Sequence, residues 1–140
     1  MGYTHIHLHT EYSLLDGATK ISELFEKVKE LGQDAVAITE HGNMNAVIKK
    51  YNYAKKAGIK LIMGMEAYIT DDLTIKQRDG PRRHHVILLA KNNIGYQNLI
   101  KLVSIASNEG FYYKPRIDYE LLKTLQMQYV TDKSYFESYI

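Results

Sequence analysis

The chain has 140 residues, of which 45% are hydrophobic, enough for one globular domain with its own core. The 18 Lys and Arg residues nearly balance the 16 Asp and Glu residues, so a net charge of +2 gives no overall electrostatic case for binding nucleic acid or membrane. The absence of cysteine excludes disulfides, thiolate metal sites and cysteine nucleophiles. Because the sequence also shows no export signal and no long apolar run, we expect a cytoplasmic protein.

The first residues alternate between polar and apolar side chains, reading YTHIHLHT at residues 3–10. If this segment is a β-strand, His5, His7 and His9 point to one face and the apolar residues between them point to the other. Asp16 follows in a turn soon afterwards. The segment therefore predicts a strand with a polar, functional face.

Helices and strands alternate along most of the chain. Apolar residues at helical spacing predict a helix at residues 21–31, and a run of small and branched residues predicts a buried strand at residues 34–39. The further predicted elements are a helix at 43–57, a strand at 59–69, a polar loop at 70–83, a strand at 85–90 and a helix at 92–107. This order predicts an α/β fold with mainly parallel strands and outer helices. A closed barrel needs about 200 residues or more, so we expect an open sheet or a partial barrel.

Histidines and carboxylates gather where the predicted strands end. The residues in question are His7 and His9 of the first strand, Asp16 after it, Glu40 and His41 at the end of the second strand and Glu66 near the end of the third. Functional groups of parallel sheets collect at this edge. His85 is the exception, because it begins its strand and reaches the same edge only if that strand is antiparallel.

Imidazoles and carboxylates without thiolates form a ligand set for zinc, manganese or iron. A single histidine is more often a surface or core residue, but an H-x-H pair, an E-H pair and a later Glu at successive strand ends favour a metal centre. Two or three such ions stabilise the attacking and leaving oxygens of a phosphoester displacement and activate water. The pattern therefore predicts hydrolytic metal chemistry.

Aromatic and basic residues alternate in GFYYKPR at residues 110–116. Such a segment is typical of surfaces that stack on bases and pair with phosphates of single-stranded nucleic acid. The candidate contacts are Tyr112, Lys114 and Arg116, together with Arg82 and Arg83 of the preceding loop. The alternative is a loop stiffened by proline and packed against the sheet, with the two arginines simply solvated.

Five segments carry a further pattern: HIHLHTEYSLLDG, AITEHGNM, GMEAYI, HHVILLAKNNIGYQNLIKLVSIAS and EGFYYKPRIDYELL. They resemble successive motifs of the PHP (polymerase and histidinol phosphatase) domain at the N-terminus of bacterial replicative DNA polymerase III alpha subunits. The resemblance implies a distorted (β/α)7 barrel, here partial, with up to three metal ions at the carboxyl ends of its strands. It also implies phosphoesterase or 3'-5' exonuclease activity, DNA or another phosphoester as substrate, and other replication proteins as partners, with no membrane association.

Matched residue by residue, the resemblance implies the metal ligands His7, His9, Asp16, His41, Glu66 and His85, with His84 as a lower-ranked neighbour of the last. We expect His5 and Glu40, which neighbour ligand positions, to orient the ligands. We predict the N-terminal part of a PHP domain at residues 1–124 and a divergent tail, irregular or β-like, at residues 125–140. The family has later ligands, a Cys or His and an Asp-x-His pair, whereas this chain has no cysteine and no histidine after His85, so we expect an incomplete cluster.

The sequence leaves three functions open, and with them whether the chain is an enzyme. The first is a metal-binding PHP domain with phosphoesterase or exonuclease chemistry and no polymerase activity in this chain alone. The second is a non-catalytic interaction or structural module of the replication machinery. The third is a small stand-alone metal-dependent phosphatase. An open barrel edge also predicts self-association.

Overall fold

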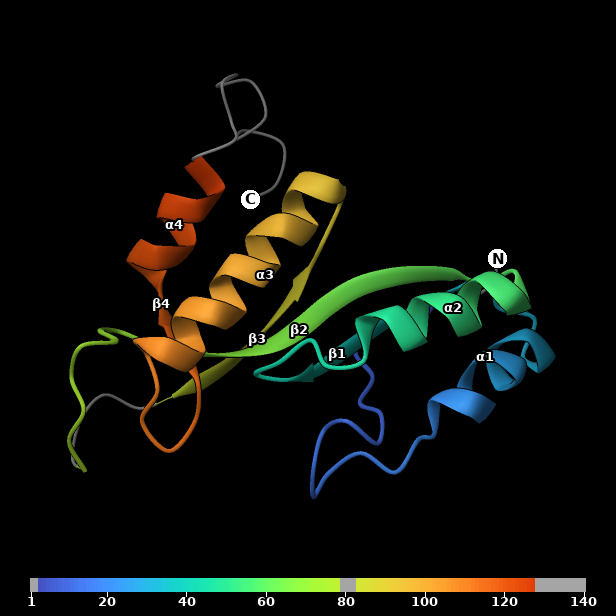
Figure 1. The fold of residues 1–140 in the computed structure, drawn as a ribbon, viewed down its shortest axis with the longest axis horizontal. Helices are drawn as coiled ribbons and strands as arrows, with labels where there is room; N and C mark the ends of the chain where they lie inside the picture. The colour runs from blue at the N-terminus through green and yellow to red at the C-terminus, as the bar shows by residue number, and fades with distance from the viewer. Residues whose placement is uncertain (1–2, 79–82, 128–140) are drawn as a thin grey trace.

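The computed structural model describes residues 3–78 and 83–127 and shows a mixed α/β fold (Figure 1). Its elements are α1 (Ile21–Glu30), β1 (Ala35–His41), α2 (Val47–Ala57), β2 (Lys60–Thr70), β3 (His84–Leu89), α3 (Asn93–Asn108), β4 (Arg116–Asp118) and α4 (Tyr119–Met127). The predicted alternation of helices and strands after residue 20 is confirmed, with bounds that differ by a few residues.

The sheet is built around β2, its longest strand. The strands β1 and β4 pair with β2 in parallel, while β3 pairs with it antiparallel. The prediction of mainly parallel strands is therefore confirmed for the described sheet, and β3 is antiparallel, the direction that brings His85 to the predicted edge. Among the described residues the strands form an open sheet in the order β1-β2-β3, with β4 beside β2, so a partial (β/α)7 barrel is not confirmed.

The strand predicted at residues 3–10 is wrong. This segment forms only single bridges, one of them between His5 and Val36. Ala37 N donates to His5 O at 2.8 Å and Thr39 N donates to Leu8 O at 2.9 Å. The segment thus advances three residues while β1 advances two, and a regular ladder requires equal steps. It follows the free edge of β1 with an extra residue in the region of His7.

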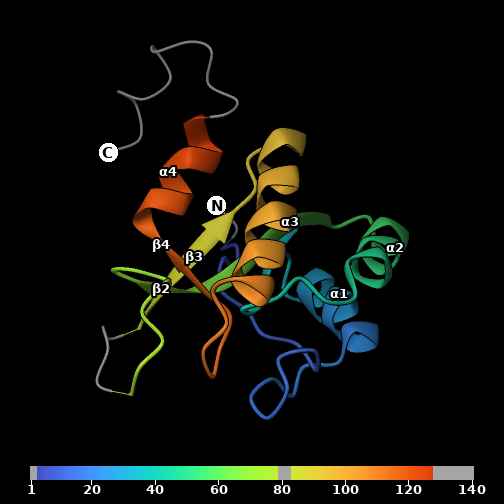
Figure 2. The same ribbon diagram turned by 60° about the vertical axis from the view of Figure 1, so that its left-hand side comes forward.

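The helices pack against one face of the sheet. Side chains from α1 and α2 bury Val36 and Ile38 of β1, and side chains from α3 and α4 bury Met65, Ala67 and Ile69 of β2. Figures 1 and 2 show these two helix pairs at opposite ends of β2. Since side chains alternate along a strand, His41 and Glu66 point to the other face. No helix within residues 3–78 and 83–127 has the length and apolar character to cross a membrane.

Local sequence signals explain two of the helix ends. The Asn92 side chain accepts a hydrogen bond from Gly95 N at 3.0 Å and begins α3, as predicted. Gly58 ends α2 with a φ of 72°. However, α2 begins four residues later than predicted, because the Asn43 side chain accepts from Asn45 N at 2.9 Å and holds a turn instead of a helical start.

The helix α4 crosses the start of the predicted tail. Residues 125–127 are helical, so the expectation of irregular structure is wrong for these three residues. The remaining residues of the tail, 128–140, lie outside the described part of the chain. The domain boundary after residue 124 therefore stays a prediction.

Candidate metal centre

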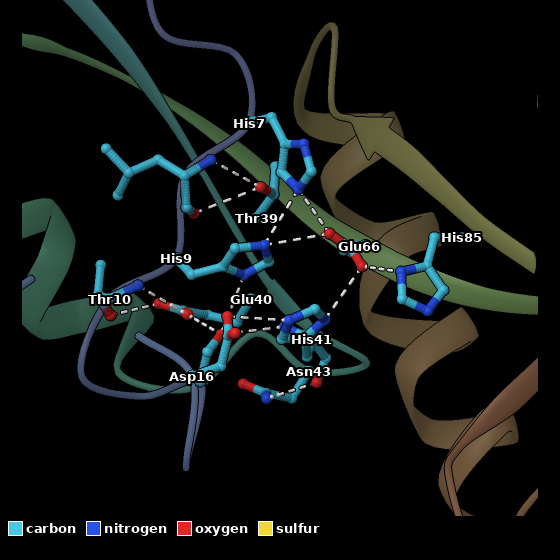
Figure 3. A network of polar contacts seen from close by, with 12 residues as sticks. His7, His9, Thr10, Asp16, Thr39, Glu40, His41, Asn43, Glu66 and His85 are labelled. Carbon is cyan, nitrogen blue, oxygen red and sulfur yellow. Dashed lines mark hydrogen bonds and ion pairs between the residues drawn. The ribbon is translucent and has the colours of Figure 1, made fainter. Parts of the chain in front are cut away.

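Glu66 lies at the centre of the polar face of the sheet, and its side chain is only 2% exposed. Figure 3 shows four imidazoles around its carboxylate. His7 Nε2 and His9 Nε2 lie 2.5 and 3.1 Å from Oε2, His41 Nδ1 lies 3.1 Å from Oε1, and His85 Nδ1 contacts Oε1 as well. Each oxygen of one carboxylate therefore faces two histidine nitrogens.

Strand pairing accounts for the positions of His41 and His85. His41 is the direct neighbour of Glu66 in the parallel pairing of β1 and β2, so both side chains share a face. His85 pairs with Tyr68, two residues beyond Glu66, and therefore shares that face too. Because β3 is antiparallel, its first residues reach the carboxyl end of β2. His84 alternates to the opposite face, in agreement with its lower rank.

All six predicted ligands come together. Asp16 Oδ2 lies 3.1 Å from His41 Nε2, and so joins the centre from the turn after the N-terminal segment. Three groups have ligand atoms within 4.8 Å of one another: His7, His9 and Glu66; His9, Asp16 and His41; and His41, Glu66 and His85. The groups overlap in His9, His41 and Glu66, and of these the carboxylate of Glu66, with its two oxygens, can be shared by two ions.

The donor atoms fit a bound cation. Glu66 Oε1 and His41 Nδ1 are buried and 3.1 Å apart, yet within the described residues neither has a hydrogen-bond partner. Buried polar atoms without partners are rare in folded proteins and costly. A divalent ion between the two atoms would satisfy both, so the residues present fit the predicted metal.

The protonation states also suit metal binding. Burial and the nearby charge of His41 lower the pKa of His9, which favours the neutral ring. Burial raises the pKa of Glu66, but the hydrogen bond with His7 and the charges of His41 and His85 outweigh it, so the pKa lies below its ordinary value. A neutral imidazole and an ionised carboxylate are the forms that bind metal.

Ser13, which the sequence reasoning missed, connects Glu40 to two of the candidate ligands. Its Oγ donates to Glu40 Oε2 at 2.5 Å, accepts from His41 N at 3.1 Å and lies 3.2 Å from His9 Nδ1. Since the hydroxyl has a single proton and gives it to Glu40, His9 donates from Nδ1. The Nε2 lone pair of His9 is thereby left for the centre. Glu40 thus acts on the ligands through Ser13 and touches neither of them.

The role predicted for His5 has no contact to support it. Its ring packs edge-on against Tyr3, with centroids 4.8 Å apart, and its carbonyl accepts from Ala37 N. Within the described residues, no hydrogen bond or ring contact joins His5 to a candidate ligand. The strand alternation that would place His5 on the face of His7 and His9 does not apply either, because the segment takes three residues where β1 takes two.

Tyr68 is a second residue that the sequence reasoning missed. Its ring stacks on His41 with centroids 6.1 Å apart and meets His85 edge-on at 4.9 Å. Burial, the largest cause, raises the pKa of Tyr68, so its hydroxyl stays protonated at neutral pH. The two-residue spacing from Glu66 along one strand is the signal that places it on the same face.

The prediction that Arg116 contacts nucleic acid is wrong. Arg116 is 2% exposed, and its guanidinium donates to three backbone carbonyls at 2.9 Å each, those of Gly110, Ile75 and Leu73. The group ties the loop after β2 to the segment before β4. It is not available to a phosphate.

The other predicted nucleic-acid contacts have different positions. Lys114 is exposed, and its Nζ lies 5.7 Å from the ring centroid of Tyr68. Arg83 Nη1 donates to Tyr112 O at 3.4 Å. Arg82 lies outside the described residues. The structure thus brings Lys114 beside the metal centre, while binding of nucleic acid there stays a prediction.

Replacing Arg116 with methionine should destabilise the fold by about 3 kcal/mol, because three carbonyls lose charge-assisted hydrogen bonds in a buried place. Urea unfolding followed by circular dichroism measures the change. Arg83→Met is the control, since Arg83 is exposed and its loss should change the unfolding free energy by no more than about 0.5 kcal/mol. Equal stability of the two variants would contradict the structural role of Arg116.

Comparison with known proteins identifies the family of the chain. A family model described as the PHP domain matches residues 5–139. The chain is 55% identical over 121 residues to DNA polymerase III subunit alpha of Helicobacter pylori and 51% identical over 129 residues to that of Aquifex aeolicus, with 86% of the chain covered in each case. It spans only 10% and 11% of these two relatives.

A solved structure from Bifidobacterium adolescentis, named as a candidate metal-dependent phosphoesterase, has the same type of fold. It aligns with 74% of this chain and 34% of its own, at a TM-score of 0.51 and 21% sequence identity. This likeness bears on the fold alone. The family model, in contrast, matches nearly the whole chain, and the chain belongs to the PHP domain family.

Proposed function

We propose that the chain holds more than one divalent metal ion, with Glu66 as the bridging ligand, and that it hydrolyses phosphoester bonds. The observation that carries the proposal is the buried carboxylate of Glu66, each oxygen of which faces two imidazole nitrogens. A carboxylate shared in this way is the usual bridge between two ions.

The ligands divide by the oxygen that they face. His7 and His9 would hold an ion at Oε2, and His41 and His85 would hold one at Oε1. Asp16 faces the second nitrogen of His41. A neutral imidazole has a single free lone pair, so His41 serves one ion at a time unless it loses both protons. The donor set suits zinc, manganese or iron.

The reaction follows from this arrangement. Bound ions would polarise a phosphoryl oxygen and lower the pKa of water. The protein residues keep the site in order: Ser13 fixes the ring of His9, and strand pairing fixes His41 and His85 beside Glu66. Glu66 remains ionised because its imidazole neighbours outweigh the cost of burial.

The relatives suggest the substrate. Both bacterial relatives are named DNA polymerase III subunit alpha, and the solved neighbour is named as a candidate metal-dependent phosphoesterase. We therefore propose DNA as substrate, 3'-5' exonuclease chemistry, and replication proteins in the cytoplasm as partners. Self-association through a sheet edge and the lack of polymerase activity in this chain stay predictions.

Metal-dependent hydrolysis tests the proposal. The chain, purified without chelators and supplied with Mn²⁺ or Zn²⁺, should hydrolyse 5'-labelled single-stranded DNA from its 3' end. Glu66→Gln and chelator should each lower the rate by roughly a hundredfold or more, since both remove the ions. Gel analysis of the products measures the reaction.

A parallel assay with p-nitrophenyl phosphate separates the alternatives. Turnover of this monoester without turnover of DNA would replace the nuclease by a stand-alone phosphatase. Turnover of neither substrate by metal-loaded protein would contradict catalysis and support a non-catalytic interaction module.

A further inference from the structure

Tyr68 has a hydroxyl that the metal centre does not use. The residue is 7% exposed, and its ring is held between His41, His85 and the backbone at Gly42. The side chain lies on the face that carries Glu66, two residues away on β2, and its hydroxyl can donate a hydrogen bond to a ligand there.

A tight turn holds Lys114 over Tyr68. Tyr112 N donates to Lys114 O at 3.1 Å, and Tyr113 between them takes a φ of 58°, which is costly for a residue other than glycine. The ammonium of Lys114 lies 5.7 Å from the centroid of the Tyr68 ring. Backbone strain at such a turn persists only where the surroundings enforce it.

Close packing enforces the position of this turn. A Cβ at Gly42 would lie 2.6 Å from Pro115 Cγ and 3.3 Å from the Tyr68 ring. Only glycine, here with a φ of 63°, lets the end of β1 approach both groups. The turn that carries Lys114 is therefore fixed against the same strand end that supplies His41.

Charge indicates what the space beside Lys114 accepts. A metal-loaded centre is a concentration of positive charge, and an ammonium ion beside it is repelled unless an anion lies between. Arg83, which donates to Tyr112 O, adds a second cation at the same turn. Two cations next to a metal centre favour a ligand with several negative oxygens, and a phosphoryl group is such a ligand.

We propose that Tyr68 and Lys114 form a phosphoryl-binding subsite beside the metal centre. The Tyr68 hydroxyl donates a hydrogen bond to one oxygen of the substrate phosphoryl group, and the Lys114 ammonium donates a charge-assisted hydrogen bond to another. The subsite rests on the proposed function, since it presents the phosphoryl group to the ions held by Glu66. In this proposal Lys114, and not the buried Arg116, is the residue of the GFYYKPR segment that contacts a phosphoryl group.

Binding of inorganic phosphate to the Mn²⁺-loaded 140-residue chain tests the subsite. Isothermal titration calorimetry gives the Kd, and metal content is measured on the same samples. Lys114→Met and Tyr68→Phe should each raise the Kd for phosphate about tenfold, while Lys114→Arg should stay near the wild-type value. Lys29→Met on α1 and Tyr51→Phe on α2 are matched controls, exposed and without expected effect.

The outcomes separate this inference from the proposed function. Metal-loaded wild type and Lys114→Met with the same Kd for phosphate would overturn the subsite and leave the metal centre standing. A wild-type chain that takes up no Mn²⁺ would overturn both. Competition by p-nitrophenyl phosphate or by a dinucleotide then shows whether the phosphoryl group of a small ester or of nucleic acid binds more tightly.

Discussion

The Glu66→Gln variant is expected to lose roughly a hundredfold or more in metal affinity, together with the second ion of the centre. Changes in groups that merely orient ligands cost tenfold to a hundredfold, and Glu66 itself faces four imidazole nitrogens with its two oxygens. The amide is nearly the same size but carries no charge, so the space is kept while the bridge is removed. Elemental analysis and calorimetry with Mn²⁺ or Zn²⁺ measure the loss.

Variants of single histidines show whether both oxygens of Glu66 hold an ion. His85→Ala should remove the ion at Oε1 and leave the ion held by His7 and His9, so the metal content falls by about one ion per chain. His84→Ala is the matched control, because His84 is adjacent in sequence and alternates to the other face of β3. Equal metal content in the His84 and His85 variants would rule out a ligand role for His85.

The sequence predicted the part of the site that depends on local pattern. A run of small and branched residues predicted the buried strand β1. The rule that functional groups lie at the carboxyl ends of parallel strands then brought His41 and Glu66 together. Both steps need only periodicity and chain order.

The direction of β3 could not be predicted from local pattern. Alternation looks the same in parallel and antiparallel strands, so alternation alone does not reveal which way the strand runs. The one hint was His85, which begins its strand and reaches the predicted edge only if that strand is antiparallel. The antiparallel pairing of β3 with β2 meets this condition. Pairing direction depends on the loop and on partners distant in sequence.

The N-terminal segment and Arg116 show how non-local contacts override a local pattern. Alternating histidines predicted a strand, but the rings of His7 and His9 contact Glu66, almost 60 residues further on, and the ladder with β1 skips a residue. The aromatic and basic residues around Arg116 in the sequence suggested a nucleic-acid contact. In the structure its guanidinium instead donates to the carbonyls of Leu73 and Ile75. Neither partner can be read from the segment itself.

Glu40 and Lys50 form a buried ion pair beneath the metal centre. Lys50 Nζ lies 2.8 Å from Glu40 Oε1, and the two side chains are 4% and 0% exposed respectively. The other oxygen of Glu40 accepts from Thr10 N at 3.0 Å and from Ser13 Oγ. Burial raises the pKa of Glu40, but the hydrogen bonds from Lys50, Ser13 and Thr10 outweigh it and hold the pKa below its ordinary value. Glu40, held ionised by Lys50, therefore attaches the N-terminal segment to β1 through these hydrogen bonds.

Lys50→Met is expected to destabilise the fold by roughly 3 to 5 kcal/mol, because it leaves the carboxylate of Glu40 buried without its counter-ion. Urea unfolding measures the change. Lys49→Met is the matched control: Lys49 is the neighbouring lysine, it is exposed, and its loss should change the unfolding free energy by no more than about 0.5 kcal/mol. Similar losses in the two variants would contradict the importance of the buried pair.

The double variant Glu40→Gln/Lys50→Met separates the charge of the pair from its hydrogen bonds. It should recover much of the stability lost in Lys50→Met, because no charge is left buried and the amide oxygen still accepts from Thr10 and Ser13. Metal affinity should then follow stability, since Ser13 keeps its contacts with His9 and His41. Recovered stability with weak metal binding would instead mean that the charge of Glu40 itself, passed on through Ser13, tunes the ligands.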